Sequence, residues 1–138
     1  MKVRSVGCFL EHLGEILIIY RTSGKADGNS WAIPAGKINE GEYQVQAIIR
    51  EIFEETGYKA SERELELLGT YKYSWPEFEL EFTAYRLKLQ NKVSIRLNQR
   101  EHSKFMWAKP DEVYEMDSLI RGFRQLLELT GYVKREYF

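Results

Sequence analysis

Three glutamates in one short segment are the residues of this sequence best suited to chemistry. Glu51, Glu54 and Glu55 lie within residues 43–56, where apolar residues recur with helical period, and Gly57 stands where a helix C-terminal cap is expected. On a helical wheel at about 100° per residue, the three carboxylates share a sector about 100° wide. The apolar residues fill a different sector, so the pattern predicts a helix with a core face and a separate carboxylate face.

This carboxylate cluster is unfavourable by itself. Like charges four residues apart destabilise a helix by about 0.2–0.5 kcal/mol per pair, and the C-terminal end of a helix disfavours negative charge. Arg50 can relieve part of the repulsion by pairing with Glu54. A divalent cation relieves more, because carboxylate oxygens are the hard ligands that Mg²⁺ prefers. A solvated acidic helix face is the alternative, since charges at this spacing are common.

The surrounding pattern favours the metal site. From Gly36 the sequence reads glycine, five residues, Glu42, seven residues, and then Arg-Glu-Ile-Phe-Glu-Glu-Thr-Gly-Tyr, which ends at Tyr58. This resembles the Nudix box: G, five of any residue, E, seven of any residue, then R-E-U-x-E-E-x-G-U, where U is aliphatic. Tyr58 departs from the last aliphatic position, which is expected to be a packing position. The residues before Gly36, from Trp31 onward, resemble the family's W-x-x-P-G-G-K lead-in, with Ala35 in place of a glycine.

The resemblance implies roles for the residues of the box. In Nudix enzymes the helix glutamates hold Mg²⁺ or Mn²⁺, which makes Glu51 and Glu55 the first candidates for metal ligands and Glu54 the next. The backbone carbonyl of Gly36 commonly joins them in the family. Arg50 is expected to orient a glutamate through a charge-assisted hydrogen bond.

The resemblance also implies hydrolysis of a diphosphate linkage, and this reaction needs a base. Metal ions neutralise the phosphate oxygens and activate a bound water, and a carboxylate then takes the proton. Family members differ in the glutamate that does this, and here Glu54 and Glu101 are the candidates. A solvated loop acid is the alternative interpretation of Glu101. Glu42, just before the helix, is expected either to be structural or to reach a second metal ion.

The residues that bind the substrate are less clear from the sequence. Arg21 ends an apolar stretch and Lys37 follows the first glycine of the box, so both are candidates for phosphate contacts; ordinary surface charge is the alternative for each. Four aromatic residues flank a turn at Pro76, and one of them could stack on a base, although packing at the ends of strands is the favoured interpretation. They are Tyr71, Tyr73, Trp75 and Phe78.

The elements that must position these residues follow from hydrophobic periodicity and turn residues. Two strands are expected around the turn His12-Leu13-Gly14, and polar loops over 22–30 and 90–103. Asp117–Thr130 has the pattern of an amphipathic helix, and Pro110 that of the first residue of a helical turn. Further strands are expected over residues 31–33, 65–71, 78–89 and 105–107. Strands mixed with helices favour an α/β fold, and the resemblance implies a Nudix-type α/β/α sandwich with a mixed β-sheet.

Length and composition limit the remaining possibilities. The 138 residues suit a single domain over residues 1–138. A net charge of -1 argues against a general nucleic-acid binder. The lone Cys8 suggests a reducing compartment, and no stretch resembles a signal peptide or a membrane span. We therefore expect a cytoplasmic protein that binds a small nucleotide or another diphosphate, with no nucleic-acid polymer or membrane as its partner and with homodimerisation left open.

The expected function is metal-dependent hydrolysis of a diphosphate linkage in a nucleoside diphosphate derivative. The first candidates are a (deoxy)nucleoside triphosphate and a dinucleoside polyphosphate, as for a MutT-like pyrophosphohydrolase. A nucleotide-sugar diphosphatase is the alternative among enzymes. A non-catalytic, nucleotide-sensing Nudix domain is the alternative outside them, and retention of all the box glutamates argues against it.

Overall fold

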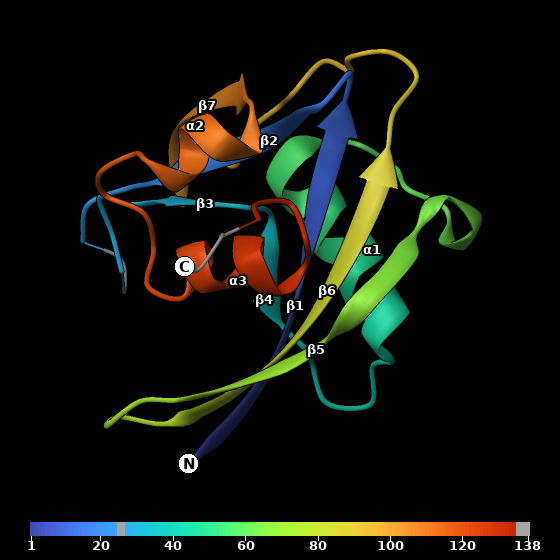
Figure 1. Ribbon diagram of the computed structural model, residues 1–138. Coiled ribbons are helices and arrows are strands. Elements are labelled where there is room, and N and C mark those ends of the chain that lie inside the picture. Colours follow the sequence, from blue (N-terminus) through green and yellow to red (C-terminus); the bar gives the residue numbers. More distant parts are fainter. Residues whose placement is uncertain (25–26, 135–138) are drawn as a thin grey trace.

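The computed structural model describes residues 1–24 and 27–134 (Figure 1). In these residues no helix combines the length and the apolar character needed to cross a membrane. The elements, in chain order, are β1 (Lys2–His12), β2 (Glu15–Arg21), β3 (Trp31–Ala32), β4 (Ala35–Lys37), α1 (Gln44–Thr56), a 3-10 turn (Glu62–Glu64), β5 (Glu66–Ser74), β6 (Glu79–Lys88), β7 (His102–Ala108), α2 (Pro110–Tyr114) and α3 (Phe123–Leu129).

The sheet is mixed. β1 and β6 run parallel at its centre, in register from Lys2 opposite Glu79 to Glu11 opposite Lys88. β5 pairs antiparallel with β6, and the short β4 pairs antiparallel with β1. β1 leads through a tight turn into β2, which pairs antiparallel with both β3 and β7. The sheet therefore brings β4 and the start of β7, which are far apart in the sequence, to the neighbourhood of the same two strands.

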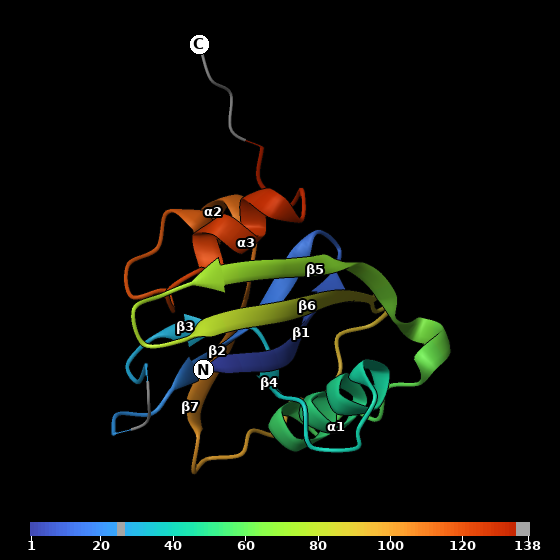
Figure 2. The ribbon, with the colours of Figure 1, turned by 90° about the horizontal axis from the view of Figure 1, so that it is seen from below.

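Helices cover both faces of the sheet: α1 lies on one side, and α2 and α3 lie on the other (Figure 2). Each side has its own hydrophobic core. The core under α1 joins Ile48 and Ile52 to Val6, Cys8 and Leu10 of β1. The opposite core is formed by alternate sheet residues, such as Phe9 and Ile18, together with residues of α2 and α3. This arrangement confirms the expected α/β/α sandwich with a mixed sheet.

The helix predicted over Asp117–Thr130 is shorter in the structure, where α3 begins only at Phe123. Ser118 and Gly122 have positive φ angles, which a helix does not accommodate. The backbone around Leu119 instead pairs with Trp31, whose N–H donates to the Ser118 carbonyl at 2.8 Å. The apolar side chains of residues 117–122 are thus half-buried because this segment pairs with the short β3. Their spacing resembles helical period, which is why the prediction was wrong here.

The other expected elements are present, with shifted ends. β7 begins at His102, inside the stretch expected to be a loop, and β4 was not predicted because three residues carry no readable pattern. Residues 22–24 and 27–30 form no helix or strand, as expected for a loop, and residues 25–26 of that loop lie outside the described residues. The early start of β7 matters for function, because it brings His102 into the sheet and places Glu101 directly before it.

The acidic segment forms α1, which ends where the sequence indicated. Gly57 caps it with φ 80°, a left-handed conformation that favours glycine. Before the helix, Glu42 anchors the incoming loop: Arg50 donates to its two carboxylate oxygens at 2.8 and 3.0 Å. The backbone N–H of Asn39 donates to the same carboxylate at 3.0 Å. This clamp fixes the loop between β4 and α1 onto the helix.

The clamp predicts a pH-dependent contribution to stability. The hydrogen bonds from Arg50, together with that from Asn39, lower the pKa of Glu42 from 4.5 to about 2. A folded-state pKa below the unfolded value stabilises the fold at pH values above about 4.5, and this contribution disappears as the pH falls toward 2. We expect Glu42→Gln to reduce the free energy of unfolding by about 1–2 kcal/mol at pH 7, because the pair is partly open to water.

Denaturant unfolding of wild type and variant between pH 7 and pH 3 measures this effect. The difference between them should be constant near neutrality and should shrink below pH 5. Glu40→Gln, an exposed position two residues earlier, controls for the loss of one negative charge. A Glu42→Gln difference that keeps its full size down to pH 3 would contradict the assignment.

Candidate active site

Two of the three helix carboxylates are buried between α1 and β4. Glu55 is 2% exposed and Glu51 is 9% exposed, whereas the Glu54 side chain is 49% exposed. The helical wheel predicted one carboxylate face opposite the core. The structure separates that face, because β4 packs over positions 51 and 55 and leaves position 54 in solvent. The buried pair therefore lies at the edge of the core under α1.

The backbone of β4 approaches these carboxylates closely. The N–H of Ala35 donates to Oε2 of Glu55 at 3.2 Å. A Cβ atom at position 36 would lie 2.2 Å from Cδ of Glu51, so any side chain there would displace the Glu51 carboxylate. Glycine at position 36 therefore lets that carboxylate lie against β4 where Arg50 holds it.

Arg50 joins the helix carboxylates to the loop before the helix. Besides clamping Glu42, it donates to Oε1 of Glu51 at 2.7 Å and to Oε2 of Glu54 at 3.3 Å. It also donates to the carbonyl oxygen of Lys37 at 3.0 Å. Because the guanidinium is planar and always charged, these contacts hold the Glu51 carboxylate in one orientation. This is the geometry expected for an arginine that orients a glutamate.

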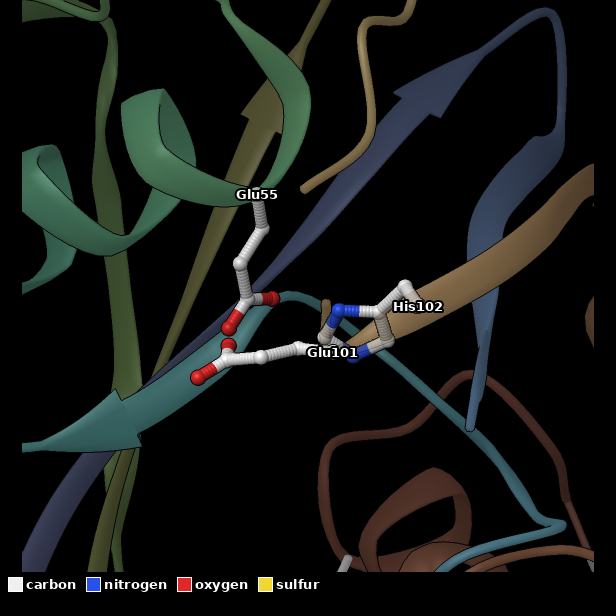
Figure 3. Close-up of side chains that lie close together, drawn as sticks. All are labelled: Glu55, Glu101 and His102. Carbon is white, nitrogen blue, oxygen red and sulfur yellow. The ribbon is translucent and has the colours of Figure 1, made fainter. Parts of the chain in front are cut away.

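Glu101, in the turn before β7, and His102, the first residue of β7, join the buried end of this cluster. The Glu101 carbonyl accepts from the N–H of Thr22 at 2.8 Å, and the Glu101 N–H donates to the Asn98 carbonyl at 3.0 Å. These bonds place the polar segment against the end of β2. One oxygen of Glu55, one oxygen of Glu101 and one imidazole nitrogen of His102 lie within 4.8 Å of one another, and the three side chains converge (Figure 3).

The cluster carries negative charge that the described residues only partly balance. Burial, and then the charge of Glu51, raise the pKa of Glu55 well above its usual value; Glu101 adds to this effect. Burial also raises the pKa of Glu51, although Arg50 opposes the shift. Hard oxygen donors, burial and mutual repulsion suit a divalent cation, which would favour the ionised forms. Glu51, Glu55 and Glu101 could therefore hold one.

The structure places the two candidate phosphate-binding residues on different sides of this cluster. Arg21 lies opposite His102 in the pairing of β2 with β7, next to a bulge, and its charge acts on the imidazole. Lys37 lines an open groove of about 530 Å³ on the other side of Gly36, together with Lys2 and Arg4 of β1. Arg21 is thus brought beside His102, and Lys37 lies on the side of the loop before α1.

The aromatic residues near Pro76 form a packed cluster. Tyr73 stacks on Trp75 with ring centroids 5.4 Å apart, and Phe78 meets Trp75 edge-on at 5.5 Å. The Arg121 guanidinium lies 4.3 Å from the centroid of the Trp75 ring and donates to Glu77 at 2.7 Å. These contacts tie the β5–β6 turn to the segment before α3, as the packing interpretation expected.

His102 is the member of the cluster that sequence reasoning missed. The sequence placed it in a polar loop, where a histidine has no particular meaning. Its side chain is instead 1% exposed, at the first position of β7. The available signal was the neighbouring Glu101, already a candidate, together with the apolar Phe105-Met106-Trp107 that follows. A strand extended backward from those residues would have brought position 102 into the sheet.

Comparison with known proteins agrees with this geometry. The family model described as the NUDIX domain matches residues 1–129. "Nudix hydrolase 2" of Arabidopsis thaliana is 26% identical over 128 residues, which cover 91% of this chain and 45% of that protein. The "CTP pyrophosphohydrolase" of Escherichia coli is 24% identical over 123 residues, which cover 82% of this chain and 80% of that protein. The chain therefore spans less than half of the Arabidopsis relative.

Solved structures show the same fold. The crystal structure of the MutT protein from Methanosarcina mazei Go1 matches with a TM-score of 0.82 at 22% identity, over 94% of this chain and 93% of that one. The match to the family model extends well beyond the box, from β1 to the end of α3. The chain belongs to the Nudix hydrolase family.

Proposed function

We propose that this protein hydrolyses the diphosphate linkage of a nucleoside diphosphate derivative with the help of Mg²⁺, or of Mn²⁺ in its place. The observation that carries the proposal is the convergence of Glu55, on α1, with Glu101, in the turn before β7, together with the proximity of Glu51 to the buried Glu55. Family membership supports hydrolysis at a divalent-metal centre. The name of the CTP pyrophosphohydrolase relative supports a nucleoside triphosphate as substrate, and a dinucleoside polyphosphate presents the same linkage.

We assign the metal to the buried carboxylates, with Glu51 and Glu55 as ligands, Glu54 at the exposed edge and the Gly36 backbone beside Glu51. A bound divalent ion neutralises the phosphate oxygens and makes its water a better nucleophile. Arg50 holds the Glu51 carboxylate in place. Arg21 and Lys37 carry positive charge on the two sides of the cluster, where the phosphates on either side of the cleaved bond would lie.

The chain supplies a carboxylate base for the attacking water. The water oxygen bonds to phosphorus, its proton passes to the carboxylate, and the bond from phosphorus to the bridging oxygen breaks. Glu54 and Glu101 remain the two candidates. Glu101 lies beside the buried Glu55, whereas Glu54 is half exposed and already accepts from Arg50. This difference in surroundings favours Glu101.

Mg²⁺ binding predicts a thermal shift. Saturating Mg²⁺ should raise the melting temperature by several degrees, because a ligand at about 100 times its Kd adds about 2.7 kcal/mol to the stability of the folded state. Glu55→Gln should abolish the rise, since it removes the most buried carboxylate. Glu62→Gln, an exposed position in the 3-10 turn, is the matched control and should retain the shift. Equal shifts in wild type and Glu55→Gln, measured by differential scanning calorimetry, would remove Glu55 from the site.

Separate Glu54→Gln and Glu101→Gln variants distinguish the two bases. We expect Glu101→Gln to lower kcat by about 100-fold or more, and Glu54→Gln to lower it less, because general base catalysis typically contributes about 10²–10⁴-fold. Turnover at saturating Mg²⁺ and substrate is the measurement. A larger loss in Glu54→Gln reverses the assignment, and losses below about tenfold in both variants would exclude both residues.

A panel of diphosphate compounds tests the reaction itself. It includes CTP, the other nucleoside triphosphates and their deoxy forms, a diadenosine polyphosphate, ADP-ribose and a UDP-sugar. We expect hydrolysis of a triphosphate or a dinucleoside polyphosphate, with ¹⁸O from labelled water in one phosphate product. Hydrolysis of the sugar derivatives alone would identify a nucleotide-sugar diphosphatase. Tight nucleotide binding without any hydrolysis would identify a sensing domain and overturn the proposal.

A further inference from the structure

His102 is a buried polar residue, and one of its ring nitrogens has no hydrogen-bond partner among the described residues. Its ring is 1% exposed, and its Nδ1 is inaccessible to water and has no hydrogen-bond partner among the described residues. Leaving a polar atom buried without a partner destabilises a fold by about 1–3 kcal/mol, so such an atom requires an explanation. The protein's other histidine differs: Nδ1 of His12 lies 3.1 Å from the Leu89 carbonyl, within hydrogen-bonding distance.

The imidazole faces the two carboxylates of the cluster. Figure 3 shows a ring nitrogen of His102 turned toward Glu55, with Glu101 on the same side. The three ligand atoms lie within 4.8 Å of one another. Ligands about 2.1 Å from a metal ion lie about 3–4 Å apart, so small side-chain movements suffice to close the three around one ion.

The charges of the three groups suit a divalent cation. Two ionised carboxylates balance its charge, and a neutral imidazole offers a lone pair. Imidazole nitrogen favours transition-metal ions, whereas a set of oxygens alone suits Mg²⁺.

We propose that Glu55, Glu101 and His102 form a mixed oxygen–nitrogen position for a divalent transition-metal ion, with the His102 imidazole as a direct ligand. The position shares Glu55 with the metal centre of the proposed function and rests on that proposal. It also takes as a ligand Glu101, the favoured base of the Mg²⁺-supported reaction, so it describes the protein when a transition-metal ion occupies this position. A transition-metal ion should bind this position more tightly than Mg²⁺, because the His102 imidazole supplies a nitrogen ligand. The oxygen ligands alone do not provide this preference.

Pulsed electron paramagnetic resonance of the Mn²⁺ complex tests the ligand directly. The wild-type protein should show ¹⁴N modulation from a coordinated imidazole, and His12→Asn should keep it. His102→Phe, which retains the ring shape but removes both nitrogens, should abolish it; His102→Asn serves if the phenylalanine variant does not fold. Wild-type protein carrying ¹⁵N-labelled histidine should change the modulation pattern. Absence of nitrogen coupling in the wild type would overturn the proposal.

Affinities measured by calorimetry give a second readout. Loss of His102 should weaken Co²⁺ binding by about tenfold or more and Mg²⁺ binding by less than about threefold, given that losing a ligand partner costs about 10–100-fold at metal sites. Equal losses for both ions would make His102 a structural residue and overturn the proposal. Mg²⁺-supported hydrolysis is scored separately. Turnover without nitrogen coupling refutes only the His102 site, whereas absence of turnover in the wild type refutes the proposed function.

Discussion

The burial of two carboxylates where α1 meets β4 is the constraint on which the rest of the structure depends. Ionised groups removed from water are strongly unfavourable unless they are paired or bind a metal. Glu51 has a partial partner in Arg50, whereas among the described residues Glu55 accepts a backbone N–H from Ala35 and shares a hydrogen bond with Glu51 itself. The fold thus holds a buried pair of carboxylates that a bound cation would stabilise, and the neighbouring elements must keep the pair in place.

That resistance comes from apolar packing on the other side of the same helix. Ile48 and Ile52 are fully buried against β1. A rotation of α1 that released its glutamates into solvent would therefore expose these two isoleucines. Burying side chains of this kind contributes about 1.5–3 kcal/mol each, which exceeds the repulsion between neighbouring carboxylates on a helix. The Arg50–Glu42 clamp then fixes the loop, and Gly36 lets β4 lie against Glu51. Core and site are two faces of one element.

Features contained within one element could be predicted from the sequence, and features that require two elements could not. Helical period and Gly57 were enough to place α1 and its glutamates. The same period could not show that β4 would cover Glu51 and Glu55 and leave Glu54 exposed, since a wheel contains a single helix. It failed for the segment before α3, where apolar residues pack because Leu119 pairs with Trp31. His102 was missed for the same reason, because its burial depends on the pairing of β7 with β2.

This division also explains why the sequence is more informative about the reaction than about the substrate. The box places three carboxylates on one helix that packs against the strand before it, so the spacing of its residues carries the chemistry. The charges around it come from separate strands: Arg21 from the end of β2, and Lys2, Arg4 and Lys37 from β1 and β4. In the sequence, none of these cations can be told from an ordinary surface residue. Only the pairing of the strands brings them near the carboxylates. These cations can therefore be exchanged one residue at a time without altering the box, so the box carries little information about the group attached to the diphosphate.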